Sequence, residues 1–158
     1  MALIEFAFLK NNNNLCSGKC KLEVMTTEEK IAYWVKLSDG DLKIAKTMLE
    51  NHYHLYTAFM CHQVIEKIFK AGYEKLKNDT PPYIHKLSSI ALQSGFMDKL
   101  TEAQLNFIFK IEPLNIEARY PSYKNLIASQ LDDNECENIF EQTKALQQWV
   151  KTEILLTK

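Results

Sequence analysis

The sequence contains few of the residues and patterns that build β-structure. Only 4 of its 158 residues are glycine, no Asn-Gly turn occurs, and no stretch alternates apolar and polar residues over the length of a strand. Alternation and tight glycine turns are the main sequence signals of strands and hairpins, so we exclude a sheet-based fold. The economical architecture that remains is all-α, an up-and-down antiparallel helical bundle of about five helices.

Cysteine is also scarce. Cys61 and Cys136 fall in apolar helical patterns, where a reduced cysteine behaves as a small hydrophobe, so we expect no disulfide framework. Cys16 and Cys20 have no second pair at a spacing that would complete a tetrahedral metal site. We therefore assign no metal site and no cofactor.

The chain lacks both an excess of positive charge and a long apolar run. Lys and Arg number 19 against 20 Asp and Glu, and the net charge of -1 provides no global field to hold a long polyanion. No window approaches the roughly 18 uninterrupted apolar residues of a membrane span. The apolar start contains Glu5 and no basic region precedes it, unlike a signal peptide. We expect a cytoplasmic protein, no membrane association and only local nucleic-acid contacts.

Residues 1–24 differ in composition from the rest of the chain. They include the low-complexity run Asn11 to Asn14 and the weakly packing segment Cys16 to Cys20. We interpret 1–24 as a flexible N-terminal extension and 25–158 as the helical bundle domain. Met25 directly precedes a helix-start signal and could itself be the natural start.

Capping and periodicity predict the helices of the bundle. Thr26 and Glu29 have capping-box spacing, and so do Thr101 and Gln104. Apolar residues keep one helical phase on both sides of Gly40, which argues against a break there. Proline cannot donate a backbone hydrogen bond, so Pro113 should stop or kink its helix. The predicted helices are 27–51, 55–77, about 85–94, one opened by Thr101, and one from about Asn134 that carries Ile139, Phe140, Leu146, Val150 and Ile154.

The predicted central helix carries polar residues on one face. Gln63, Glu66, Lys67 and Lys70 lie three or four residues apart within Phe59 to Ala71. Together with Trp34, Asp41-Leu42, His85-x-Leu87 and Ala118-Arg119-Tyr120-Pro121, this pattern resembles the HEPN family, the higher eukaryotes and prokaryotes nucleotide-binding domains, of the small stand-alone bacterial or archaeal type. The resemblance spans roughly residues 28 to 155. It implies a bundle of four or five helices, frequent homodimers, and a small nucleotidyltransferase partner in toxin-antitoxin arrangements.

The sequence departs from the catalytic members that it resembles. Those ribonucleases, which need no metal, carry an Arg-x4-6-His motif, in which the arginine offsets phosphate charge and the histidine handles protons. Positions 124, 125 and 126, where the histidine would follow Arg119, hold Lys124, Asn125 and Leu126. Histidines 52, 54, 62 and 85 all precede Arg119, and a surface lysine is a poor base at neutral pH. We assign no catalytic residue and keep Arg119, His62 and His85 as candidates.

The proposed ligand-binding residues each have a structural alternative. Arg119 could grip a phosphate or pair with Glu66 or Glu117, and Tyr120 with Lys124 could hold a base and its phosphate or form a dimer seam. Glu66 and Lys67 could form a buried structural pair. His62 and Glu66 are better explained as a hydrogen-bonded core pair than as metal ligands, and His85 as a residue that fixes a loop. The ligand-binding set is Arg119, Tyr120, Lys124, Gln63, Glu66, Lys67 and Lys70.

Three functions follow from these observations. The first is a noncatalytic HEPN-type nucleotide- or RNA-binding module that forms a homodimer and acts with a nucleotidyltransferase. The second is a metal-independent ribonuclease toxin with a rearranged site of Arg119 and an upstream histidine. The third is a structural adaptor whose polar helix only fixes the bundle. The missing histidine favours the first function.

Overall fold

A computed structural model describes residues 25–117 and 131–156 of the chain. Within these ranges every regular element is a helix. The elements are α1 (Thr27–Glu50), α2 (His54–Lys77), α3 (Leu87–Ser94), the 3-10 turn η1 (Met97–Lys99), α4 (Glu102–Ile111), α5 (Leu114–Glu117), α7 (Asp133–Trp149) and the π-helical turn η2 (Val150–Leu155), which continues α7. The predicted all-α bundle is confirmed.

Both predicted capping boxes start helices. The Thr26 hydroxyl accepts a hydrogen bond from the Glu29 amide at 3.2 Å, and the Glu29 carboxylate accepts one from the Thr26 amide at 3.0 Å. Thr101 and Gln104 repeat the arrangement at the start of α4. Because each box satisfies two backbone donors that a helix start leaves free, these starts could be located in the sequence.

The helix ends also follow the local signals. α1 runs through Gly40 without a break, and α3 ends at Gly95, whose φ of 82° is the left-handed conformation that glycine adopts without strain. α4 ends at Ile111, two residues before Pro113. Pro113 directly precedes α5, where its missing N–H removes no helical hydrogen bond.

Helix α3 starts later than predicted, at Leu87 rather than about His85. The Glu112 carboxylate accepts a hydrogen bond from the Ser88 amide at 2.7 Å, so a residue from the end of α4 satisfies the first turn of α3. The His85 side chain is held by α2 instead. Long-range contacts of this kind leave no local signal, and for that reason the predicted helix was too long.

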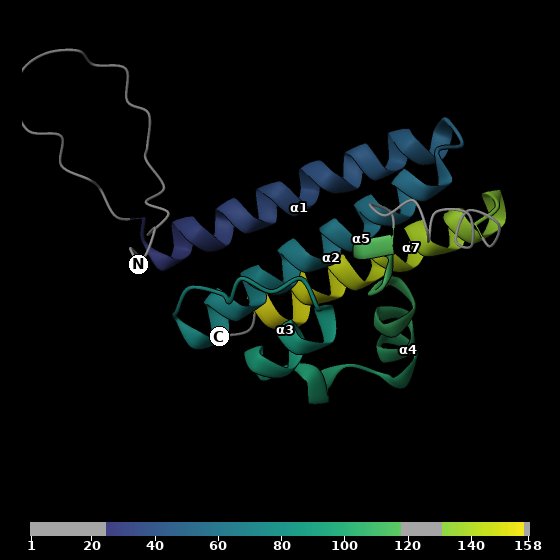
Figure 1. Cartoon of the computed structure of the whole chain (residues 1–158). Coiled ribbons are helices and arrows are strands. Elements are labelled where there is room, and N and C mark those ends of the chain that lie inside the picture. Colours follow the sequence, from purple (N-terminus) through teal and green to yellow (C-terminus); the bar gives the residue numbers. More distant parts are fainter. Residues whose placement is uncertain (1–24, 118–130, 157–158) are drawn as a thin grey trace, which may run out of the picture.

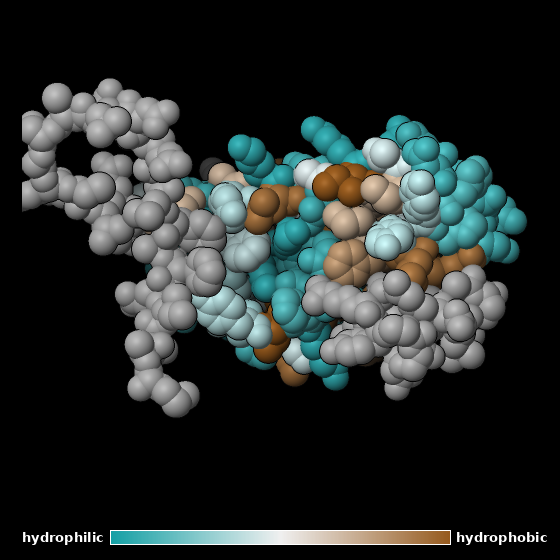
Figure 2. Space-filling view, turned by 45° about the horizontal axis from the view of Figure 1, so that its top comes forward, coloured by the Kyte–Doolittle hydropathy of each residue, from teal (hydrophilic) through white to brown (hydrophobic). Residues whose placement is uncertain are grey.

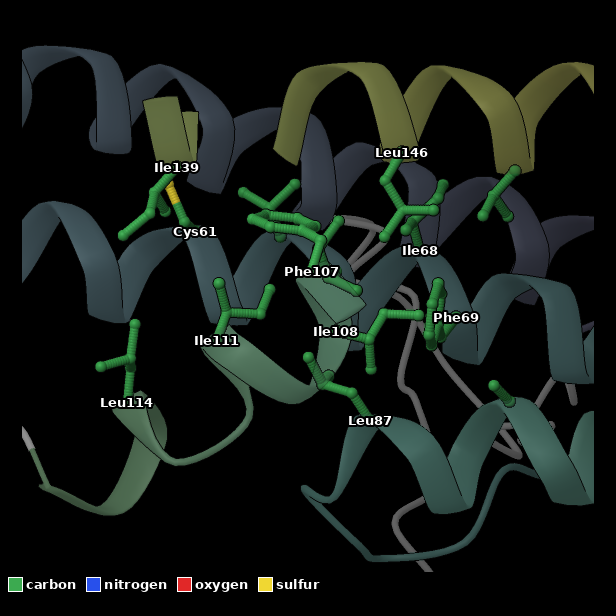
Figure 3. Packing of buried hydrophobic residues seen from close by; sticks show 14 of the residues in the cluster. Cys61, Ile68, Phe69, Leu87, Phe107, Ile108, Ile111, Leu114, Ile139 and Leu146 are labelled. Atoms are coloured by element: carbon green, nitrogen blue, oxygen red, sulfur yellow. The ribbon is translucent and has the colours of Figure 1, made fainter. Parts of the chain in front are cut away.

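Helix α2 is the central element (Figure 1). It runs antiparallel to α1, with α7 beside it and with α3 and α4 on the side away from α1. Figure 3 shows how its buried side chains Cys61, Ile68 and Phe69 meet residues of four other helices. These partners are Leu87 of α3, Phe107, Ile108 and Ile111 of α4, Leu114 of α5, and Ile139 and Leu146 of α7.

Gly72 of α2 makes room for an aromatic contact in this core. A Cβ at position 72 would lie 3.1 Å from Cε1 of Phe96, closer than most Cβ contacts in proteins, so the ring would have to shift. With glycine there, the Phe96 ring packs edge-on against Phe69 at a centroid distance of 5.1 Å, a favoured aromatic geometry. No helix of the described residues is both long enough and apolar enough to cross a membrane.

Candidate functional site

A buried carboxylate, Glu66, is the centre of the polar group on α2. Its side chain is 5% exposed, and it accepts a hydrogen bond from Nζ of Lys70, one turn later, at 2.7 Å. Both of its oxygens also lie 3.0 Å from Nδ1 of His85, in the segment that leads into α3. The Glu66 cluster, which we define as Glu66, Lys70, His85 and His62, therefore fastens the α2–α3 connection to the central helix.

The partners of Glu66 keep its buried carboxylate ionised. Burial raises the pKa of Glu66, but the hydrogen bonds and positive charges of Lys70 and His85 outweigh it, and the net pKa lies below the usual 4.5. Lys70 also lies 5.4 Å from the centre of the Trp34 ring on α1, a favourable position for a cation. Glu66 is thus an ionised, well-partnered carboxylate at neutral pH.

His62 lies one turn before Glu66 and is fully buried. Its Nδ1 is 4.0 Å from the Glu66 carboxylate, and neither ring nitrogen forms a well-aligned hydrogen bond within the described ranges, although the backbone of His85 is close enough to raise its pKa slightly. Burial lowers the pKa of His62 to about 4, and nearby Glu66 offsets only part of this effect. The predicted hydrogen-bonded His62–Glu66 pair is therefore wrong, because the carboxylate is turned toward Lys70 and His85.

Two further polar residues of α2 reach neighbouring helices. Lys67 pairs with Asp41 of α1, and both side chains are mostly buried. Gln63 donates a hydrogen bond to the side chain of Asn115 on α5 at 3.2 Å. The predicted Glu66–Lys67 pair does not form, because consecutive residues on a helix face different neighbours.

Three of the predicted ligand-binding residues, Arg119, Tyr120 and Lys124, lie outside the described residues. The other four, Gln63, Glu66, Lys67 and Lys70, share the polar side of α2, and each has a partner inside the fold. Of the two histidine candidates for catalysis, His62 is buried, whereas the His85 side chain is 61% exposed. Figure 2 shows hydrophilic side chains gathered across the middle of one face of the molecule, between more hydrophobic areas.

The structure also groups three residues that the sequence analysis did not connect. His52, His54 and Asp133 place one possible metal-binding atom each within 4.8 Å of one another. The only sequence signal was the His-x-His pattern at 52 and 54, between the helices predicted for 27–51 and 55–77. Asp133 is 79 residues beyond His54, so the third member could not be found from sequence spacing.

Comparisons with known proteins agree with the architecture. A family model described as the HEPN domain matches residues 31–153. The chain is also similar in structure to TT1696 from Thermus thermophilus, with a TM-score of 0.66 and 15% sequence identity, over 77% of this chain and 96% of that one. At this identity the structural similarity shows the fold alone. The sequence matches none of the curated proteins with which it was compared.

Proposed function

The chain belongs to the HEPN domain family, and on this basis we propose that it is a noncatalytic nucleotide- or RNA-binding module that acts with a nucleotidyltransferase partner in a toxin-antitoxin-like arrangement. Membership of the family suggests a nucleotide- or RNA-related function. Three parts of the proposal are more specific than family membership: the absence of catalysis, the nucleotidyltransferase partner and the homodimer. They rest on the family resemblance and on the residues of the site.

The main observation in support is that two groups of the Glu66 cluster, Glu66 and His62, have pKa values that are shifted away from neutral pH. A general base works best when its pKa is close to the working pH. The pKa of Glu66 is lowered by its partners, and the pKa of His62 is lowered to about 4 while its ring is fully buried. Together with the missing histidine after Arg119, these shifts support binding without cleavage.

Ligand binding is proposed for the segment that follows α5. Asn115 of α5 contacts Gln63 of α2, and Arg119 comes four residues later in the sequence. Four residues span at most about 14 Å, so an Arg119 side chain that reaches toward this part of α2 is compatible with the length of the chain. Arg119 would bind a phosphate through its planar fork of donors, and Tyr120 and Lys124 would contact a base and a second phosphate.

The polar residues of α2 then support the site rather than bind the ligand directly. Lys67 and Lys70 are each neutralised by a carboxylate of the same fold, and Gln63 is bound to Asn115. A cation that is already paired gives up one partner to gain another, so it adds little affinity for phosphate. We infer that the polar residues of α2 hold α1, α5 and the α2–α3 connection in place beside the bound molecule.

Fluorescence anisotropy with labelled single-stranded RNA and labelled nucleotides tests this proposal. Arg119→Ala should weaken binding by at least about tenfold, the loss expected for a charged hydrogen bond to phosphate. Lys144→Ala provides a matched control, because Lys144 is exposed and pairs with Glu141 on its own helix. Unchanged affinity in Arg119→Ala, with a lower melting temperature, would instead support the structural adaptor.

A second test addresses the partner. The untagged chain should coelute in size-exclusion chromatography with a nucleotidyltransferase encoded by the neighbouring gene, and it should elute as a homodimer in its absence. A monomer that fails to bind any such enzyme would refute this part of the proposal.

A second candidate function is supported by the contact between Glu66 and His85. The carboxylate binds Nδ1 of a largely exposed imidazole, which directs Nε2 away from Glu66. A buried carboxylate that orients a histidine in this way is a common feature of acid–base sites. If this chain is a ribonuclease, RNA cleavage in the presence of a chelator should be lost in both His85→Gln and Arg119→Ala. RNA that remains intact after long incubation with the unmodified protein would exclude cleavage.

A further inference from the structure

The turn between α1 and α2 meets the start of α7 at one end of the molecule (Figure 1). His52 lies in the turn, His54 is the first residue of α2, and Asp133 is the first residue of α7. Figure 2 shows that the surface at this end is mainly hydrophilic. Two imidazoles and one carboxylate from three helix ends thus converge where they are accessible from solvent.

The three side chains meet at a single oxygen. Nδ1 of His52 lies 2.6 Å and Nε2 of His54 lies 2.7 Å from Oδ1 of Asp133. A tetrahedral zinc ion with bonds of about 2.0–2.1 Å keeps its ligand atoms about 3.3 Å apart. The separation of each nitrogen from Oδ1 would therefore grow by less than about 1 Å to admit the ion, which side-chain rotation can supply.

His52 occupies a backbone position that usually belongs to glycine. Its φ is 59°, its amide donates to the Leu49 carbonyl at 3.0 Å, and the Tyr53 amide donates to the Met48 carbonyl at 2.9 Å. These bonds form the Schellman motif at the end of α1, in which the left-handed residue is most often glycine. A residue with a side chain is less favourable there than glycine, and this backbone position directs the His52 side chain to the site where it meets Asp133.

The Asp133 carboxylate is not used to cap the start of α7. Asp132, the preceding residue, caps α7 by accepting a hydrogen bond from the Glu135 amide at 2.8 Å. The Asp133 carboxylate instead points to the two imidazoles.

We propose that His52, His54 and Asp133 form a surface binding site for Zn²⁺. Two imidazole nitrogens and one carboxylate oxygen suit a borderline transition metal ion, whereas Mg²⁺ and Ca²⁺ prefer oxygen ligands throughout. Three protein ligands leave a fourth position for water or for a donor atom of a bound molecule. The bound ion would link the α1–α2 turn to α7 and would stabilise the folded state.

Competition with a chromophoric zinc chelator tests the site in the metal-free full-length chain. The wild-type chain should bind one equivalent of Zn²⁺ at this site, and binding should raise the melting temperature. His54→Gln and Asp133→Asn should each weaken that binding by roughly a hundredfold or more and remove most of the stabilisation, because loss of an outer-shell partner of a ligand alone costs about 10–100-fold. Asp132→Asn is the matched control, because asparagine also caps helices and the zinc affinity should not change.

Cys16 and Cys20 are alternative zinc ligands in the same chain, so the double variant Cys16→Ser, Cys20→Ser completes the test. It should retain the equivalent bound at His52, His54 and Asp133. Co²⁺ bound to this variant should show visible d–d absorption without the charge-transfer bands of a thiolate. The proposal is overturned if His54→Gln and Asp133→Asn bind zinc as tightly as the wild type, or if the double cysteine variant binds none.

Discussion

Glu66 and His85, 19 residues apart in the sequence, are joined by contacts of 3.0 Å between both carboxylate oxygens and Nδ1 of the imidazole. The carboxylate is almost fully buried, whereas the histidine is largely exposed. The contact therefore links the buried Glu66 carboxylate to an imidazole on the surface next to α3. It also fixes the segment between Lys77 and Leu87, a part of the described chain that has no helix of its own.

The first prediction concerns the pair of Glu66 and Lys70. Glu66→Gln should lower the free energy of unfolding by about 3 kcal/mol, because it leaves the buried Lys70 ammonium without its counter-charge. The double variant Glu66→Leu, Lys70→Leu should recover most of this loss, since apolar residues of similar size need no counter-charge. Urea denaturation followed by circular dichroism measures both values. If the loss of stability in the double variant equals the sum of the losses in Glu66→Leu and in Lys70→Leu, the two residues act independently.

The second prediction concerns His62 and pH. Burial lowers its folded-state pKa from 6.5 to about 4, so the unfolded chain binds an extra proton between these values. The contribution of His62 to stability should therefore be fully present above pH 6.5. The free energy of unfolding should fall by about 3 kcal/mol as the pH drops to 4, which is the amount that corresponds to the difference between the two pKa values. His62→Leu should remove this part of the pH dependence and should be more stable than the wild type at pH 4.5.

Cys61→Ala is the control for this measurement. Cys61 is the adjacent buried residue, and burial raises its pKa to about 12, so it does not titrate in the acidic range. Its substitution should lower stability by a similar amount, about 1 kcal/mol, at pH 7.5 and at pH 4.5. An unfolding free energy of His62→Leu that declines with acid as steeply as that of the wild type would assign the pH dependence to other groups.

Most of the fold could be predicted because its signals are local. Thr26 with Glu29 and Thr101 with Gln104 mark two helix starts through contacts three residues apart, and Gly95 marks a helix end. The apolar stripe of α7 was also visible in the sequence, and Ile139, Leu146, Val150 and Ile154 are buried. Local hydrogen bonding and periodicity carry this information without reference to the rest of the chain.

The pairings of the site could not be predicted in the same way. The sequence placed Gln63, Glu66, Lys67 and Lys70 on one helix, but their partners depend on which helix each side chain faces. Asp41 reaches Lys67 from 26 residues away, and Asn115 reaches Gln63 from 52 residues away. Asp133 joins His52 from 81 residues away. Such contacts follow from tertiary packing and leave no periodic trace in the sequence.

The third prediction compares two glycines that lie in different backbone conformations. Gly40 is inside α1, and a Cβ there would meet no atom within 4 Å, so Gly40→Ala should raise the free energy of unfolding by about 0.5–1 kcal/mol. Gly95 has a φ of 82°, and Gly95→Ala should lower it by about 1 kcal/mol through backbone strain. Thermal unfolding of the two variants should show shifts of opposite sign. A destabilised Gly40→Ala would indicate that α1 needs flexibility at this point.

The fourth prediction separates cations that bind the ligand from cations that are occupied within the fold. The affinity of a protein for RNA falls with salt, and each phosphate neutralised in a single strand contributes about 0.7 to the slope of log K against log salt. Lys124→Met should reduce the slope by about this amount if Lys124 binds a phosphate. Lys67→Met should leave the slope unchanged, because the Lys67 charge is already neutralised by Asp41 in a mostly buried pair.

Asp41→Asn provides the complementary measurement for the same prediction. Removing the carboxylate frees the Lys67 ammonium, which should increase both the affinity for RNA at low salt and the steepness of the salt dependence. Removing both charges, in Asp41→Asn with Lys67→Met, should restore the wild-type slope, because the pair carries no net charge. If Lys67→Met alone reduces the slope as much as Lys124→Met does, then Lys67 leaves Asp41 to bind phosphate, and the polar side of α2 is part of the ligand-binding surface itself.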